Sequence, residues 1–232
     1  MGDVKIQQAG LAVRPAILDL FCCAGGAAKG YHDAGFDVVG VDIRPQPNYP
    51  YEFHQADALE FPLDGFAAIH ASPPCQANVK GLRAVNAALG RTDQHVDLIP
   101  ATRERLIAAG VPYVIENVEG AALRNPVRLC GSSFALPLRR HRLFEVNFSV
   151  MVPPCNHSWQ TQRRYWTSWR PNGERRLSTV VQVYGNAGDS SEWAAAMEIG
   201  WMTRDELREA IPPAYTRFLG DYLMLAVEAV AA

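Results

Sequence analysis

Short apolar runs recur along the first two thirds of the chain, and each ends at small or polar residues. Runs of four to eight apolar residues between turn-forming residues are typical of buried β-strands. A segment with helical spacing, residues 96–109, lies between two of these runs. The pattern predicts strands at residues 16–21, 36–41, 66–71, 111–115 and 142–148.

Strands that alternate with helical segments favour a parallel sheet with helices on both faces, a Rossmann-like α/β fold. Residues 1–148 are predicted to form this core. Residues 149–182 break the pattern and are rich in Pro, Trp, Arg and Ser, which indicates a small inserted lobe. Residues 183–232 are predicted to be helical from Ser191 and to complete the core, with a break at Ile211-Pro212-Pro213.

The composition, 48% hydrophobic and 20% charged over 232 residues, fits a soluble globular protein with a sizeable core. The net charge of -2 argues against a general nucleic-acid coating protein. Residues 139–176 nevertheless hold eight arginines and two glutamates, so they form either a phosphate-binding patch or a solvated loop.

No apolar stretch has the length of a signal peptide or a membrane span, so we expect no membrane association. The five cysteines are irregularly spaced, which argues against a disulfide framework. We expect a monomer in a reducing cytoplasm.

Polar and small residues follow several predicted strands, at the point where each strand ends. They are residues 19–26, Asp42, residues 72–76 and the pair Glu116-Asn117. Ligands of parallel α/β sheets bind at the carboxyl ends of the strands. The coincidence therefore predicts one shared site.

The small residues in 19–26 allow the backbone to approach a ligand, and the helix that follows can face a carboxylate. Asp42 is placed to accept hydrogen bonds from ribose hydroxyls, and Asp57 from an adenine amino group. The same residues are also compatible with a simple turn and two helix caps. A glycine-rich turn followed later by an acidic residue does not distinguish a dinucleotide-binding site from an S-adenosylmethionine-binding site.

Cys75 follows two prolines that hold the chain rigid, and cysteine is an intrinsically strong nucleophile. A buried structural cysteine is the alternative. Glu116 and Asn117 can grip the ring nitrogen and amino group of a base, provided that burial raises the glutamate pKa. Arg140 and Arg142 alternate on a predicted strand, so one face would present both to a base carbonyl and a phosphate. A solvated edge strand would explain them equally.

In combination and order, these motifs resemble the DNA cytosine carbon-5 methyltransferase family. The resemblance covers residues 16–148 and 205–230. The motifs are DLFCCAGG at 19–26, acids at 42 and 57, PPCQ at 73–76, ENV at 116–118, RRHRLF at 139–144 and IPPAY at 211–215.

The resemblance implies methyl transfer from S-adenosylmethionine to cytosine in double-stranded DNA. It implies that Cys75 attacks carbon 6 of a flipped-out cytosine, that Glu116 protonates ring nitrogen 3 and that Asn117 shapes the pocket. Arg140 would contact the base carbonyl and Arg142 would support the site. The implied cofactor site consists of Asp19, Phe21, Gly25, Gly26, Asp42, Ile43, Asp57, Ala58 and Pro73.

The chain departs from the family pattern at three places. Cys23 replaces the first glycine of the cofactor turn, and Leu138 replaces a glutamine. The region available for target recognition, residues 149–182, is short, as in compact bacteriophage members. We therefore predict a short or relaxed recognition sequence. The resemblance also implies the cytoplasm of a bacterial or phage-infected bacterial cell.

Other substrates and classes remain open. The same chemistry on RNA or a free cytosine nucleotide is one alternative, and a catalytically inactive relative that binds cofactor or DNA is another. A dinucleotide-dependent oxidoreductase would leave PPCQ and ENV unexplained.

The lobe contains two further features. Cys130, Cys155 and His157 offer three zinc ligands, but no fourth is clear, so we expect no metal site. Trp159, Trp166 and Trp169 alternate with arginines and fit either DNA stacking or a small core.

Overall fold

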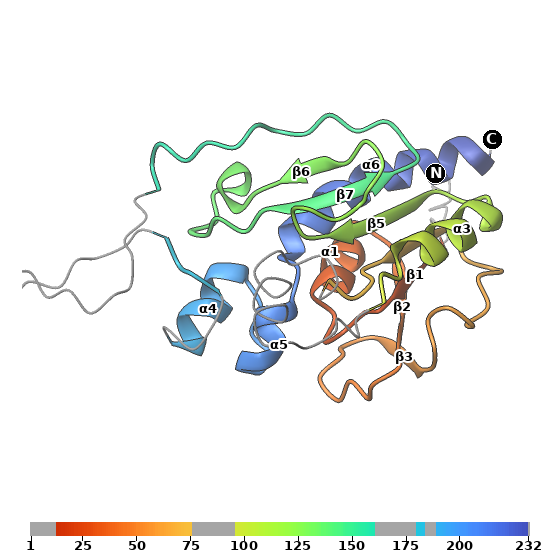
Figure 1. Ribbon diagram of the computed structural model, residues 1–232, viewed down its shortest axis with the longest axis horizontal. Coiled ribbons are helices and arrows are strands. Elements are labelled where there is room, and N and C mark those ends of the chain that lie inside the picture. The colour runs from red at the N-terminus through yellow and green to blue at the C-terminus, as the bar shows by residue number, and fades with distance from the viewer. Residues whose placement is uncertain (1–12, 76–95, 161–179, 184–188, 232) are drawn as a thin grey trace, which may run out of the picture.

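A seven-stranded sheet lies at the centre of the computed structural model, which describes residues 13–75, 96–160, 180–183 and 189–231 (Figure 1). Its strand order is β3-β2-β1-β4-β5-β7-β6. The strands are β1 (Ala16–Leu20), β2 (Asp37–Asp42), β3 (Glu52–Gln55), β4 (Ala68–Ala71), β5 (Tyr113–Asn117), β6 (Val127–Leu129) and β7 (Arg142–Val146).

The sheet is parallel from β3 to β5, as the alternating pattern predicts. The remaining part differs, because β7 pairs antiparallel with both β5 and β6. The expectation of a wholly parallel sheet is therefore wrong at this edge. An apolar run shows that a strand is buried but not which way it points.

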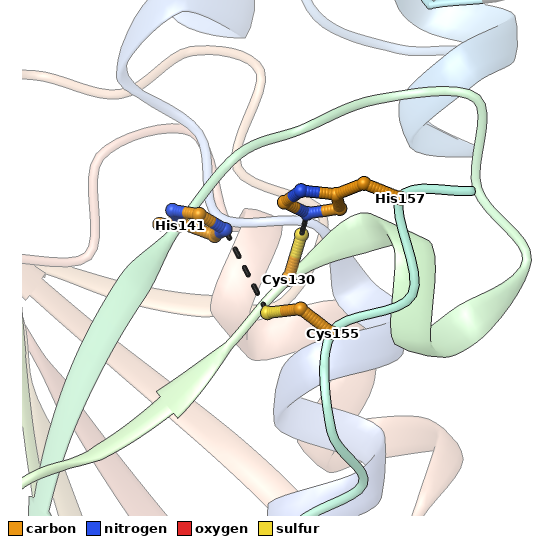
Figure 2. Close-up of side chains that lie close together, drawn as sticks. All are labelled: Cys130, His141, Cys155 and His157. Carbon is orange, nitrogen blue, oxygen red and sulfur yellow. Dashed lines mark hydrogen bonds between the residues drawn. The ribbon is translucent and has the colours of Figure 1, made fainter. Parts of the chain in front are cut away.

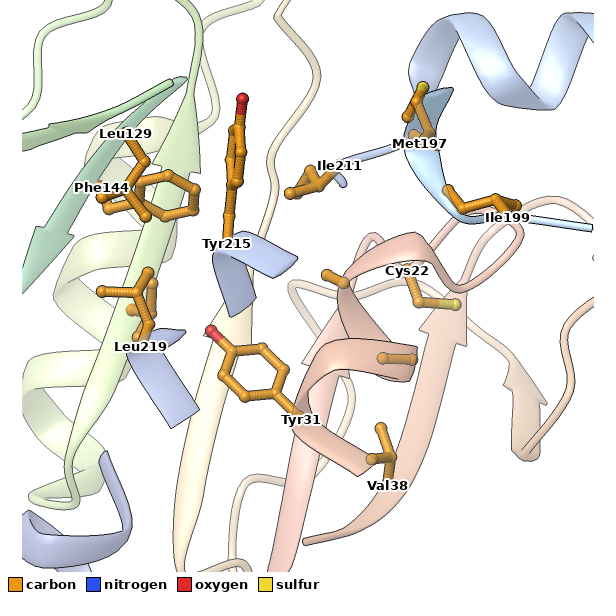
Figure 3. Packing of buried hydrophobic residues seen from close by; sticks show 14 of the residues in the cluster. Cys22, Tyr31, Val38, Leu129, Phe144, Met197, Ile199, Ile211, Tyr215 and Leu219 are labelled. Carbon is orange, nitrogen blue, oxygen red and sulfur yellow. The ribbon is translucent and has the colours of Figure 1, made fainter. Parts of the chain in front are cut away.

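Helices cover the two faces of the sheet, and the strand residues alternate between the two resulting cores. Ile17 of β1 joins the core beneath α1 (Gly26–Asp33) and α6 (Pro213–Ala231). Figure 3 shows Tyr31 of α1 and Tyr215 of α6 in this core. Leu18 and Leu20 join the opposite core, which includes Leu106 of α3 (Ile99–Ala109). The prediction of helices on both faces is confirmed.

The α1 and α6 helices touch backbone to backbone through glycines. A Cβ added at Gly30 would lie 2.2 Å from the Pro213 carbonyl oxygen and 2.1 Å from the Thr216 hydroxyl. That hydroxyl donates to the Ala27 carbonyl at 2.9 Å. This close approach fixes the end of the chain against its beginning.

The C-terminal segment is helical and broken where the proline pair predicts. Helix α4 is Ser190–Met197, and α5 (Arg204–Glu209) begins with a capping box between Thr203 and Glu206. Helix α6 starts at Pro213. The first position of a helix tolerates proline, because a backbone N–H there would have no partner within the helix. None of the helices in the described ranges combines the length and the apolarity that a bilayer crossing needs.

Residues 149–160 run beside the β7–β6 edge as an extended segment, drawn in teal in Figure 1. Val150 and Val152 pack against the core, and the Tyr222 hydroxyl of α6 donates to the Met151 carbonyl. The rest of the predicted lobe up to residue 179 lies outside the described residues, including Trp166 and Trp169.

Candidate active site

A cavity of about 390 Å³ opens at the carboxyl ends of β1, β2, β4 and β5. This is the edge at which parallel sheets of this kind bind ligands. Nine predicted site residues line it: Asp19, Phe21, Gly26, Asp42, Ile43, Pro73, Cys75, Glu116 and Arg142. The remaining predicted residues, Gly25, Asp57, Ala58, Asn117 and Arg140, do not line it.

The turn after β1 bends sharply through left-handed backbone conformations. Phe21 has φ 58°, Cys23 φ 45° and Gly25 φ 83°. The carboxylate of Asp42 accepts hydrogen bonds from the backbone N–H groups of Cys23 (3.1 Å) and Arg44 (2.9 Å). Asp42 therefore anchors the turn in addition to lining the cavity. Cys23 occupies a conformation that favours glycine, so the turn keeps its shape at a cost in strain.

Asp19 is a buried carboxyl group without a partner. It is 1% exposed, and neither side-chain oxygen has a hydrogen-bond partner among the described residues. Burial, together with the nearby Asp42, raises the pKa of Asp19 well above its usual range. A cationic ligand group in the cavity would compensate this carboxylate.

The described residues that follow β4, from Ser72 to Cys75, are held from two sides. Ser72 N–H donates to the Leu20 carbonyl at 3.1 Å, and the Asn117 amide donates to the Pro73 carbonyl at 2.9 Å. Asn117 is therefore positioned behind these residues and supports them. Burial raises the pKa of the Cys75 thiol, Arg142 lowers it and Glu116 raises it further. The resting side chain is a neutral thiol.

Glu116 faces the cavity beside Arg142, whose Nε lies 3.0 Å from a carboxylate oxygen of Glu116. Glu116 is only 6% exposed. Burial raises its pKa, although Arg142, Arg140 and a hydrogen bond from Ser72 oppose the shift. The direction predicted from the sequence is confirmed.

Arg140 does not share a strand face with Arg142, because β7 begins only at Arg142. Its guanidinium donates to the carbonyls of Val183 (3.0 Å) and Arg208. Burial lowers the pKa of Arg140 to about 9, and its Nε is buried without a partner among the described residues. The sequence-based expectation of two arginines on one strand face is wrong. Arg140 instead ties the C-terminal segment to the site.

Asp57, Gly25 and Ala58 have local structural roles. The Asp57 carboxylate accepts from Leu59 N–H at 2.8 Å, and its carbonyl accepts from Phe61 N–H. Gly25 approaches Tyr49 and Pro50, and Ala58 is buried in the α3-side core. Asp57 is thus placed as a turn cap outside the cavity wall.

A buried polar chain behind Glu116 escaped the sequence analysis. The Tyr31 hydroxyl lies 2.9 Å from His70 Nδ1, and His70 Nε2 lies 2.8 Å from the Ser72 hydroxyl, which bonds Glu116. Burial lowers the pKa of His70 to about 3, so this imidazole is neutral. A lone histidine in an apolar run gave no signal for this role.

The C-terminal segment supplies a cavity wall that was also missed. Met202, Glu209 and Ile211 line the cavity, and Glu209 forms an ion pair with Arg44 at 3.3 Å. The IPPAY motif was the available signal, because it begins at Ile211.

The arginine-rich segment is only partly described. Arg139 donates to Gln160 and to the His157 carbonyl, and Arg142 pairs with Glu116. These arginines are engaged within the protein. The predicted phosphate-binding arginines at 163, 164, 170, 175 and 176 lie outside the described residues.

Solved structures share this fold. A protein described as a prophage-encoded DNA modification methyltransferase (E. coli) has a TM-score of 0.60 at 12% identity, covering 92% of this chain and 99% of its own. The Dnmt2 methyltransferase of S. pombe has a TM-score of 0.53 at 14% identity, covering 94% and 100%. The methyltransferase EhMeth of Entamoeba histolytica has a TM-score of 0.55 at 9% identity, covering 91% and 98%.

The sequence matches no protein-family model and no curated protein. At 9–14% identity, the structural likeness shows that the chain has the Rossmann-like fold of these methyltransferases.

Proposed function

We propose that this protein transfers a methyl group from S-adenosylmethionine to carbon 5 of cytosine in DNA, with Cys75 as the nucleophile. The observation that carries the proposal is the joint placement of Cys75 and the Glu116–Arg142 pair on the wall of one cavity, next to the β1 turn. The fold shared with three methyltransferases supports the same class of reaction.

The cavity fits S-adenosylmethionine in size and chemistry. Its volume of about 390 Å³ lies in the usual range of small-molecule sites. The unpartnered Asp19 suits the cationic methionine end of the cofactor, and Phe21 and Ile43 offer apolar contact to its adenine. Asp42 keeps acceptor capacity for ribose hydroxyls. When bound, the cofactor supplies an electrophilic methyl group.

Cys75 and Glu116 then have complementary tasks. The neutral Cys75 thiol first gives its proton to water. The thiolate sulfur then bonds to carbon 6 of the base while the double bond between carbons 5 and 6 opens, and this makes carbon 5 nucleophilic. The raised pKa of Glu116 keeps a proton available for ring nitrogen 3, which neutralises charge developing on the ring. Once carbon 5 carries the methyl group, it loses its proton to water, the double bond between carbons 5 and 6 reforms, and the bond between sulfur and carbon 6 breaks to release the Cys75 thiolate. Glu116 takes back the proton from ring nitrogen 3.

The base must leave the DNA duplex to reach this cavity, at a cost of a few kcal/mol. We propose that residues 149–182 form a reduced target-recognition region. Trp159, which is 42% exposed, is the described aromatic residue of this region that a nucleic acid can reach. A region of this size offers few base contacts, which is why we predict a short recognition sequence.

The test is nucleoside mass spectrometry after incubation of the protein with S-adenosylmethionine and unmethylated duplex DNA. We expect 5-methylcytosine with the wild type and none with Cys75→Ala, while both bind S-adenosylhomocysteine. Parallel incubations with transfer RNA and deoxycytidine monophosphate test the alternative substrates. Intact cofactor binding with no methylated cytosine on any substrate would overturn the proposal in favour of an inactive relative.

A further inference from the structure

Four potential metal ligands from three segments of the chain meet beside the antiparallel edge of the sheet (Figure 2). Cys130 directly follows β6, and His141 directly precedes β7. Cys155 and His157 come from the extended segment 149–160. One ligand atom from each side chain lies within 4.8 Å of the other three.

We propose that Cys130, His141, Cys155 and His157 bind one structural zinc ion. The expectation of no metal site rested on the lack of a fourth ligand, and the structure supplies it as His141. This histidine lies within the arginine motif, so its spacing from the other three gave no metal-binding signature.

The distances fit tetrahedral zinc. Bonds of about 2.3 Å to sulfur and about 2.0 Å to nitrogen place neighbouring ligand atoms about 3.3–3.8 Å apart. The Cys130 sulfur lies 3.2 Å from His157 Nε2, and the Cys155 sulfur lies 3.7 Å from His141 Nε2. The dashed lines in Figure 2 mark these two pairs. The widest separation, at most 4.8 Å, requires only a small inward movement of the side chains.

Groups behind the ligands fit a metal site as well. His141 Nδ1 lies 3.4 Å from a Glu119 carboxylate oxygen, so that Nε2 is directed at the ion in a carboxylate–histidine–metal arrangement. The Ser132 hydroxyl donates to the Cys130 sulfur at 3.2 Å, which stabilises a thiolate. Two thiolates and two imidazoles form a closed set typical of structural zinc.

The ion would join the β6 end, the β7 start and the extended segment 149–160, which has no helix or strand of its own. His141 stands between Arg140 and Arg142, so the metal also fixes the backbone from which both arginines extend. A disulfide between Cys130 and Cys155 would leave the two converging histidines unexplained, and both cysteines are free thiols in the structure.

The experiment measures zinc in the full-length protein after expression in zinc-containing medium, by inductively coupled plasma mass spectrometry. We expect about one zinc per chain in the wild type, and a loss of at least about fivefold in Cys155→Ser and His157→Gln. The matched controls are Cys75→Ala and His54→Gln, a cysteine and a histidine outside the cluster, and both should keep the metal. Glu119→Gln should weaken zinc affinity by about tenfold.

Cobalt substitution of the wild type gives a readout that does not depend on whether the variants fold. Tetrahedral Co²⁺ with two thiolates should show sulfur-to-cobalt charge-transfer absorption, which excess Zn²⁺ abolishes. Reduced wild-type protein that binds neither ion after reconstitution would overturn the proposal. Retention of full zinc by Cys155→Ser and His157→Gln, or a Cys130–Cys155 disulfide in the unreduced protein, would do so too.

Discussion

At the scale of single residues, the pKa of Glu116 depends on a polar chain that runs from Ser72 in the cavity wall to His70 and Tyr31 behind it. His70 is neutral, and the Ser72 hydroxyl bonds Glu116 while accepting from His70 Nε2. The Tyr31 hydroxyl then donates to His70 Nδ1, which fixes one tautomer. This chain of hydrogen-bonded groups therefore lowers the pKa of Glu116, which burial raises.

Ser72→Ala should raise the pKa of Glu116, because it removes a hydrogen bond to the ionised carboxylate. If protonated Glu116 is required, activity falls as pH rises through that pKa. We expect this alkaline limb of the kcat profile to move upward by about one pH unit in the variant. Ser133→Ala, which removes a hydroxyl bonded to the Pro154 carbonyl, is the control. A limb that stays in place or moves to lower pH contradicts the predicted role of Ser72.

Cys23 is a second residue-scale case, since its φ of 45° suits glycine. Cys23→Gly should keep or raise the melting temperature, because relief of strain offsets the added freedom of the unfolded chain. Cys23→Val should lose about 1–2 kcal/mol, or about 2–8 °C, since a β-branched side chain adds strain there. Differential scanning calorimetry of both variants and the wild type decides this. A melting temperature of Cys23→Val equal to that of the wild type would show that the turn is not strained.

At the scale of elements, the sequence predicts the strands that carry a buried apolar run. Their observed first residues differ from the predicted ones by no more than two positions. It misses β3 and β6, because these short strands, EFHQ and VRL, carry exposed polar residues and no apolar run. It also misses that β7 is antiparallel and that Arg140 precedes it. The cavity residues at strand ends were predictable because the carboxyl ends of parallel strands converge. His141 was not recognised as a ligand, since only tertiary structure brings it to Cys155.

One buried ion pair joins α3 to β7. The Arg103 guanidinium bonds Glu145 at 2.8 and 2.7 Å, and the two side chains are 7% and 3% exposed. Burial alone would raise the pKa of Glu145, but the hydrogen bonds from Arg103 and Arg124 outweigh it and the net shift is downward. The stabilisation from this carboxylate is therefore present above its unfolded pKa and is lost as pH falls through the folded value.

Glu145→Gln should destabilise the protein by about 3–5 kcal/mol near pH 7, because it leaves the Arg103 charge buried without a counterion. The double variant Arg103→Met/Glu145→Leu should recover most of this loss. Urea denaturation measures both, and Glu52→Gln on the exposed side chain in β3 is the control. The difference between wild type and Glu145→Gln should shrink towards pH 4. If Glu145→Gln lowers the free energy of unfolding by less than about 1 kcal/mol, water must solvate the Arg103 guanidinium in place of the lost counterion.

At the scale of the whole molecule, the two ends of the chain close one cavity. The Trp201 indole donates to the Ala24 carbonyl at 2.9 Å, and the Asn48 amide donates to Glu206 at 3.0 Å. With α6 packed on α1, the cavity is lined by parts of the chain as far apart in sequence as Asp19 and Ile211. Ligand binding should therefore stabilise the entire fold.

S-adenosylhomocysteine at 100 times its Kd should stabilise the wild type by about 2.7 kcal/mol, a shift of about 5–11 °C for a chain of this size. Asp19→Asn should remove most of this shift, because the carboxylate that faces the cationic end of the ligand is gone. Without ligand the variant should melt higher than the wild type. The raised folded pKa of Asp19 means that the wild type is stabilised by this group at low pH and loses that stabilisation as pH rises through the folded pKa. The advantage of Asp19→Asn should therefore grow as pH rises from the unfolded pKa of an aspartate, about 3.9, towards the raised folded pKa. A shift with NAD and none with S-adenosylhomocysteine would instead favour a dinucleotide-binding protein.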